Sequence, residues 1–182
     1  MRFTFFVVVT CLCGLPAVAE VPAVSGDAAA CLEGPMAQFG RYVGDWKITD
    51  EQIKSDGSGW EPQQGARWVF ECLKNGIAVQ DYWHAAGGGF GTNLRTYNPD
   101  TGAWEIVWAA GNLNGLMHIT ASEDANGDIV MDILKPETPQ PRRIIFFQPD
   151  EDGWNWVQQW SFDDGETWTD VYRIRATPWP GS

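Results

Sequence analysis

Residues 153–175 read GWNWVQQWSFDDGETWTDVYRIR, which is two runs of alternating apolar and polar residues around a short acidic segment. Successive side chains of a β-strand point to opposite faces, so a period of two indicates strands with one buried face. The segment Asp163-Asp164-Gly165 has the turn chemistry of a hairpin. We therefore predict two antiparallel strands here. Alternation places the large side chains on one face: Trp154, Trp156, Trp160, Phe162, Trp168, Tyr172 and Ile174.

The same pattern extends over most of the chain. From residue 44 onward, short apolar runs alternate with segments rich in Gly, Asn, Asp and Pro. Connections this short join antiparallel neighbours, and closing such a meander into a barrel removes its exposed edges. We predict an all-β, antiparallel up-and-down meander barrel of about 8–10 strands. The strands are expected near 44–51, 66–74, 77–84, 90–97, 103–109, 115–122, 128–134, 142–148, 153–162 and 167–176.

One short helix is expected before the first strand. Pro35 suits the first position of a helix, and Met36, Phe39 and Val43 recur at helical spacing after it. Such a helix has one apolar face to bury. We expect it to cap one mouth of the barrel.

Length and composition set the remaining limits. The chain has 182 residues, is 44% hydrophobic and contains 11 Trp, 9 Phe and 4 Tyr, which suffices for the core of one domain. Its 12 basic and 24 acidic residues give a net charge of −12. Such a chain repels phosphate backbones and anionic membrane surfaces, so neither nucleic acid nor a membrane surface is expected as a partner.

The N-terminal residues resemble an export signal. Arg2 precedes an apolar run, and Ala17-Val18-Ala19 has the small-x-small form of a cleavage site. We predict a signal peptide over 1–19 and a periplasmic or secreted protein, with no membrane span after its removal. The predicted mature chain comprises an arm and short helix over 20–43, a barrel over 44–177 and a tail over 178–182.

Signal removal would leave two cysteines, Cys31 and Cys72. An even pair in an oxidising compartment predicts a disulfide, and the alternative is two separate buried thiols. The chain has no C-x-x-C motif and its two histidines lie far from both cysteines in sequence, so no metal site is expected.

Gly44-Asp45-Trp46, at the start of the first strand, resembles the G-x-W signature of lipocalins and other calycins. The stretches 75–81, 91–99 and 103–108 are similar to a bacterial group of lipocalin-like proteins without assigned activity. This resemblance covers roughly residues 36–176. It implies a calycin barrel in which Trp46 closes one end against an arginine of the last strand, Arg173 or Arg175. It does not imply one activity, because calycin barrels include carriers, haem proteins and enzymes.

Four polar residues lie on otherwise apolar strand faces: Asp81, His118, Gln158 and Asp170. Burial of such groups is unfavourable unless each has a partner or a ligand. A carboxyl group in a dry interior is a candidate for proton transfer, with His118 as its complement. The alternative is that each carboxylate is a satisfied core group, paired with Arg95 or with a tyrosine hydroxyl.

Three functional hypotheses follow. The first is an exported barrel that binds a small apolar or aromatic molecule in its lumen, without a cofactor. The second is a cofactor-free isomerase, cyclase or dehydratase that uses Asp81 and His118 as acid and base, with Asp170 as a further catalytic candidate. The third is haem binding through His84 or His118, as in the nitrobindin branch of calycins. The first assigns ligand contacts to Trp83, Arg95, Trp108, Trp156, Gln158 and Tyr172.

Overall fold

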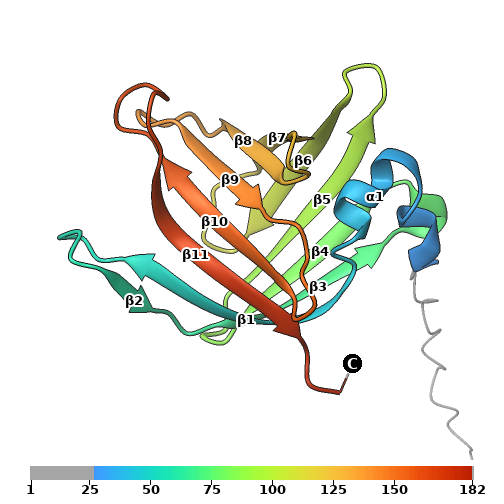
Figure 1. Cartoon of the computed structure of the whole chain (residues 1–182), viewed down its shortest axis with the longest axis horizontal. Helices are drawn as coiled ribbons and strands as arrows, with labels where there is room; N and C mark the ends of the chain where they lie inside the picture. The colour runs from blue at the N-terminus through green and yellow to red at the C-terminus, as the bar shows by residue number, and fades with distance from the viewer. Residues whose placement is uncertain (1–26, 182) are drawn as a thin grey trace, which may run out of the picture.

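The computed structural model describes residues 27–181 of the chain (Figure 1). The predicted signal peptide over 1–19 lies outside the described residues. The described part contains three short helices before the first strand and a fourth between the third and fourth strands. The helices are η1 (Ala28–Cys31), η2 (Gly34–Met36), α1 (Ala37–Gly40) and η3 (Lys74–Gly76). The strands are β1 (Gly44–Ile53), β2 (Trp60–Pro62), β3 (Ala66–Cys72), β4 (Val79–Ala85), β5 (Phe90–Asn98), β6 (Ala103–Ala110), β7 (Met117–Glu123), β8 (Ile129–Lys135), β9 (Arg142–Phe146), β10 (Trp154–Trp160) and β11 (Thr169–Pro178).

The strands form a closed antiparallel meander. From β3 to β11 each strand pairs with its neighbours in sequence, β3 also pairs with β1, and β11 pairs with β1 to close the barrel. The predicted all-β meander barrel is therefore confirmed, with ten strands in the wall among residues 27–181. Strand β2 was not predicted. It pairs only with the last residues of β1 and forms a hairpin that projects from the wall (Figure 1).

The N-terminal helices cover one end of the barrel, at the right of Figure 1 and opposite β2. Pro35 lies in the first turn of η2, as predicted, and the chain continues directly into α1. Phe39 of α1 and Tyr42 after it are fully buried. The indole Nε1 of Trp104 donates a hydrogen bond of 2.7 Å to Oε1 of Gln38, and the Tyr42 hydroxyl donates one of 3.0 Å to the Phe147 carbonyl. We call this covered end the helix end and the opposite end the open end.

The predicted disulfide between Cys31 and Cys72 is present. It joins η1 to the last residue of β3 and so fastens the N-terminal segment to the barrel wall. Gly40 packs directly on this segment, because a Cβ atom there would lie 1.7 Å from the Cys31 carbonyl oxygen.

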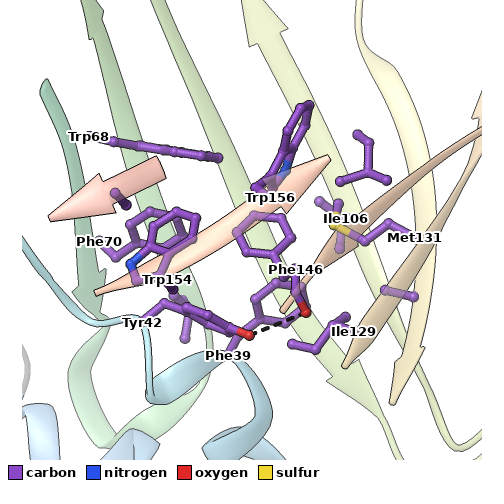
Figure 2. Packing of buried hydrophobic residues seen from close by; sticks show 14 of the residues in the cluster. Phe39, Tyr42, Trp68, Phe70, Ile106, Ile129, Met131, Phe146, Trp154 and Trp156 are labelled. Carbon is purple, nitrogen blue, oxygen red and sulfur yellow. Dashed lines mark hydrogen bonds between the residues drawn. The ribbon is translucent and has the colours of Figure 1, made fainter. Parts of the chain in front are cut away.

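Aromatic side chains fill the helix end. Phe39 contacts Trp104 edge to face, with ring centroids 4.8 Å apart, and Tyr42 contacts Trp154 at 5.3 Å. Figure 2 shows Phe39 and Tyr42 gathered with Trp154 and Phe146. Burial of these rings supplies the main hydrophobic contribution to stability.

A β-bulge changes which side chains face inward near the open end. Gln158 pairs with Tyr172 but Gln159 pairs with Asp170, so Val171 is an extra residue in β11. Residues before the bulge therefore face the opposite way from the alternation predicted for them. The predicted inward position of Trp168 is wrong, because the Arg143 guanidinium lies 4.1 Å above its ring on the outer face. The prediction for Phe162 is also wrong: it lies beyond the end of β10 and is 67% exposed.

Candidate functional site

The barrel contains a cavity of about 220 Å³ next to the aromatic core. Arg95 lies at its inner limit and is 1% exposed, whereas Trp83, Trp108, Gln158 and Tyr172 are partly exposed. The cavity therefore opens to solvent toward the open end of the barrel. All residues for which ligand contacts were predicted line it: Trp83, Arg95, Trp108, Trp156, Gln158 and Tyr172.

Aromatic pairs shape the wall of this cavity. Trp83 of β4 contacts Trp68 of β3 edge to face at 5.1 Å, and Trp156 of β10 contacts Tyr172 of β11 at 5.8 Å. Edge-to-face packing holds each ring in one orientation. Figure 2 shows Trp68 and Trp156 on the far side of Phe146 from Phe39. The remaining wall is largely aliphatic and comes from Met117, Ile119, Met131, Ile133, Ile144 and Ile174.

Trp108 packs unusually close to the neighbouring strand. Gly91 of β5 leaves room for its ring, because a Cβ atom on Gly91 would lie 2.2 Å from Cη2 of the indole. The absence of a side chain at Gly91 therefore allows Trp108 to lie against β5 at the cavity wall. Sequence reasoning placed this glycine in the expected strand 90–97 and gave it no packing role. A glycine inside an otherwise apolar strand can indicate such a close approach.

Arg95 forms the floor of the cavity. It is ion-paired with Asp81, which is fully buried. Its guanidinium carbon lies 4.9 Å from the ring centroid of Phe39 and 5.2 Å from that of Phe70, so aromatic faces stabilise the cation. Burial lowers the pKa of Arg95, and the adjacent carboxylate of Asp81 opposes that shift.

Asp81 is held by a second residue that the sequence did not single out. Asn93 donates its backbone N–H to Oδ1 at 3.1 Å, and its side-chain amide donates to Oδ1 at 3.1 Å and to Oδ2 at 3.0 Å. Asp81 lies behind Arg95 and is not among the described residues that line the cavity. Asp81 is therefore a core carboxylate whose partners are Arg95 and Asn93. This is one of the two alternatives that the sequence left open.

Tyr172 connects the cavity wall to another buried carboxylate. Its hydroxyl donates a hydrogen bond to Oδ2 of Asp50, whose Oδ1 accepts one of 2.9 Å from the backbone N–H of Gly65. Burial and the contact with Asp50 raise the pKa of Tyr172 above its usual range. Asp50 was missed, although it alternates with Trp46 and Ile48 in the first strand, the same signal that selected Asp81.

The structure does not bring Asp81 and His118 together. His118 lies exposed on β7, between Met117 and Ile119, which both line the cavity. The prediction that His118 faces the interior is therefore wrong, because alternate residues of one strand face opposite sides of the wall. The carboxylate of Asp81 is buried inside the wall and the imidazole of His118 is outside it.

The prediction that Asp170 faces the interior is wrong for a different reason. The bulge at Val171 places Asp170 on the outer face, where it accepts a hydrogen bond of 2.6 Å from Gln159. His84 is also exposed and contacts Phe90 at the β4–β5 hairpin. Neither His84 nor His118 is among the described residues that line the cavity, so neither is placed to bind haem iron inside it.

The calycin resemblance implies a contact between Trp46 and an arginine of the last strand, but these residues have other partners. The indole Nε1 of Trp46 donates a hydrogen bond of 2.8 Å to the Tyr42 carbonyl. Arg173 and Arg175 lie on the outward positions of β11 and form ion pairs with Glu51 and Asp150 instead. The expected contact between Trp46 and one of these arginines is therefore wrong, because inward and outward positions alternate along β11.

No protein-family model matches the chain, and no curated protein matches it. Residues 27–181 contain no helix of the length and apolarity required to cross a bilayer. Within the same residues, no three His, Cys, Asp or Glu side chains are grouped in a way that would hold a metal ion.

Proposed function

We propose that this barrel binds a small apolar or aromatic molecule in its cavity, between Trp83, Trp108 and Trp156, with the polar end of the ligand directed to Arg95. The observation that carries the proposal is the combination of an apolar cavity with one buried cation at its floor. Concave, mostly apolar cavities with few polar groups are typical of small-molecule sites. A lipocalin-like carrier likewise binds its ligand in the lumen of its barrel.

The size of the site sets the expected affinity. Burial of roughly 300 Å² of apolar ligand surface contributes about 7 kcal/mol before the costs of immobilisation. The affinity is therefore expected to be no tighter than the micromolar range.

The experiment is a titration of the purified chain with a panel of small apolar and aromatic molecules, followed by Trp fluorescence and calorimetry. A saturable response is expected for at least one member. Trp108→Leu should weaken that binding by about tenfold, because it removes a cavity wall. The matched control is Trp168→Leu, which removes a tryptophan from the outer face. Absence of a saturable response across the panel, or equal losses in both variants, would contradict the proposal.

Export is part of the same proposal. The signal-like residues 1–19 and the disulfide between Cys31 and Cys72 support a periplasmic or secreted location. Expression of the full chain in a Gram-negative host should yield a periplasmic product whose N-terminal sequence begins at Glu20. A product that stays in the cytoplasm with Met1 intact would oppose this assignment.

A further inference from the structure

Two buried hydrogen-bond donors on the described residues that line the cavity have no acceptor. Arg95 lines the cavity, and its Nη1 is ion-paired with Asp81, whereas its Nε is buried without a hydrogen-bond partner among the described residues. The indole Nε1 of Trp68, another lining residue, is also buried without a partner. Buried donors without acceptors are rare and unfavourable in folded proteins. These groups would be stabilised by an acceptor from outside the chain.

The other polar groups near the floor already have partners. Asn93 donates both its backbone and side-chain N–H groups to Asp81, and Tyr172 donates its hydroxyl to Asp50. The donors of the lining that are left buried without partners are therefore Nε of Arg95 and Nε1 of Trp68. A ligand that contributes an acceptor fits this site better than one that contributes another donor.

The charge at the floor is already balanced. Asp81 is in direct contact with Arg95, and Arg95 is the one charged residue among the described residues that line the cavity. An anionic ligand group here would place a second negative charge beside the same guanidinium, in an environment of low dielectric constant. Desolvation of that anion would not be offset by a further cation.

We infer that the polar end of the ligand is an uncharged hydrogen-bond acceptor, such as the carbonyl oxygen of a ketone or aldehyde, bound by the unpartnered Nε–H of Arg95. The inference rests on the proposed function, because it specifies the chemistry of the ligand bound in the same cavity. It separates this site from arginine sites that recognise carboxylates, in which the guanidinium is free of an internal counter-ion.

The test compares three probes of similar shape: benzylacetone, hydrocinnamate and n-butylbenzene. They carry a ketone, a carboxylate and an alkyl group on the same phenylalkyl skeleton. Calorimetry on the intact, disulfide-bonded chain should show benzylacetone binding at least about tenfold more tightly than n-butylbenzene, because only the ketone accepts from Arg95. Hydrocinnamate should bind at least about tenfold more weakly than benzylacetone.

A substitution of the counter-ion provides the second arm. Asp81→Asn removes the negative charge but keeps an oxygen that can accept from Asn93. The guanidinium then lacks its counter-ion, so hydrocinnamate should gain at least about tenfold in affinity and become the preferred probe. Asp132→Asn, an equal charge change at an exposed position of β8, is the control and should leave the order of the probes unchanged.

The outcomes separate the inference from the proposed function. If n-butylbenzene binds as tightly as benzylacetone, or hydrocinnamate binds as tightly as the ketone to the wild-type chain, the inference is overturned while the cavity is still a binding site. If none of the three probes binds, the proposed function fails and the inference fails with it. If Asp81→Asn does not fold by near-UV circular dichroism, the three affinities of the wild-type chain decide the question.

Discussion

The indole of Trp108 packs against the backbone of Gly91 so closely that a Cβ atom on Gly91 would lie 2.2 Å from Cη2 and 2.3 Å from Cζ2 of the ring. We expect Gly91→Ala to displace Trp108 and to lower the free energy of unfolding by about 1–3 kcal/mol, as overpacking does. Urea unfolding and the near-UV circular dichroism of the indole measure the two effects. Gly111→Ala is the control, because a Cβ atom there meets nothing within 4 Å. Equal stabilities of the two variants would show that Trp108 has room to move.

The buried pair of Asp81 and Arg95 should behave as one unit. Asp81→Ala leaves an unpaired buried cation and is expected to destabilise the fold by about 3–5 kcal/mol. The double variant Asp81→Ala, Arg95→Met removes both charges and should recover most of that loss. A double-mutant cycle from urea unfolding gives the coupling between them. Additive losses would mean that the two side chains do not depend on each other.

The buried tyrosines predict a loss of stability in alkaline solution. Burial raises the pKa of Tyr42 to about 12 from a usual value of 10.0, and burial with the Asp50 contact raises that of Tyr172. Because each pKa is higher in the folded state, folding favours the protonated hydroxyl. The stabilisation is complete below about pH 10 and is lost as pH rises through the raised pKa values.

This dependence can be measured by urea unfolding at a series of pH values from about 8 to 12. The wild-type free energy of unfolding should be level at first and then decline. In the variant Tyr42→Phe, Tyr172→Phe the decline should be much shallower, because neither ring can ionise. An equally steep decline in that variant would assign the effect to other groups.

Reduction of the disulfide should loosen the helix end. The bond between Cys31 and Cys72 spans a sequence separation of 41, which corresponds to about 4 kcal/mol of stabilisation in the chain-entropy treatment. We expect Cys31→Ser, Cys72→Ser to lower the unfolding midpoint in urea and to make peptide bonds near η1 sensitive to limited proteolysis. A midpoint equal to that of the oxidised wild-type chain would contradict this expectation.

Much of the fold could be predicted because the chain encodes it locally. Short turns made antiparallel neighbours the simplest topology, and the large aromatic residues identified the buried faces of β6, β10 and much of β11. The predicted ligand positions line the cavity for the same reason. On these strands one face is clearly more apolar than the other.

The errors occurred where the sequence of a single strand did not determine which of its two faces is buried. His118 shares its face with Leu116, which is 51% exposed, so an apolar neighbour on β7 did not indicate the interior. The directions predicted for Asp170 and Trp168 are reversed by a single extra residue, Val171. This residue has no distinctive sequence signal. The contact between Asp50 and Tyr172 joins residues 122 apart, and such a pairing depends on the closed barrel.

Closure of the wall by β1 and β11 determines when the protein can fold. Strand β1 finds this partner, with Trp46 opposite Pro178, only after synthesis has reached β11. Such distant pairing is slow, because the entropy of a very long loop is lost before its contacts form. A chain terminated before β11 would carry unpaired backbone along both β1 and β10, which invites association between molecules. Nonsense mutations in the codons before β11 should therefore produce aggregates instead of a shortened, working barrel.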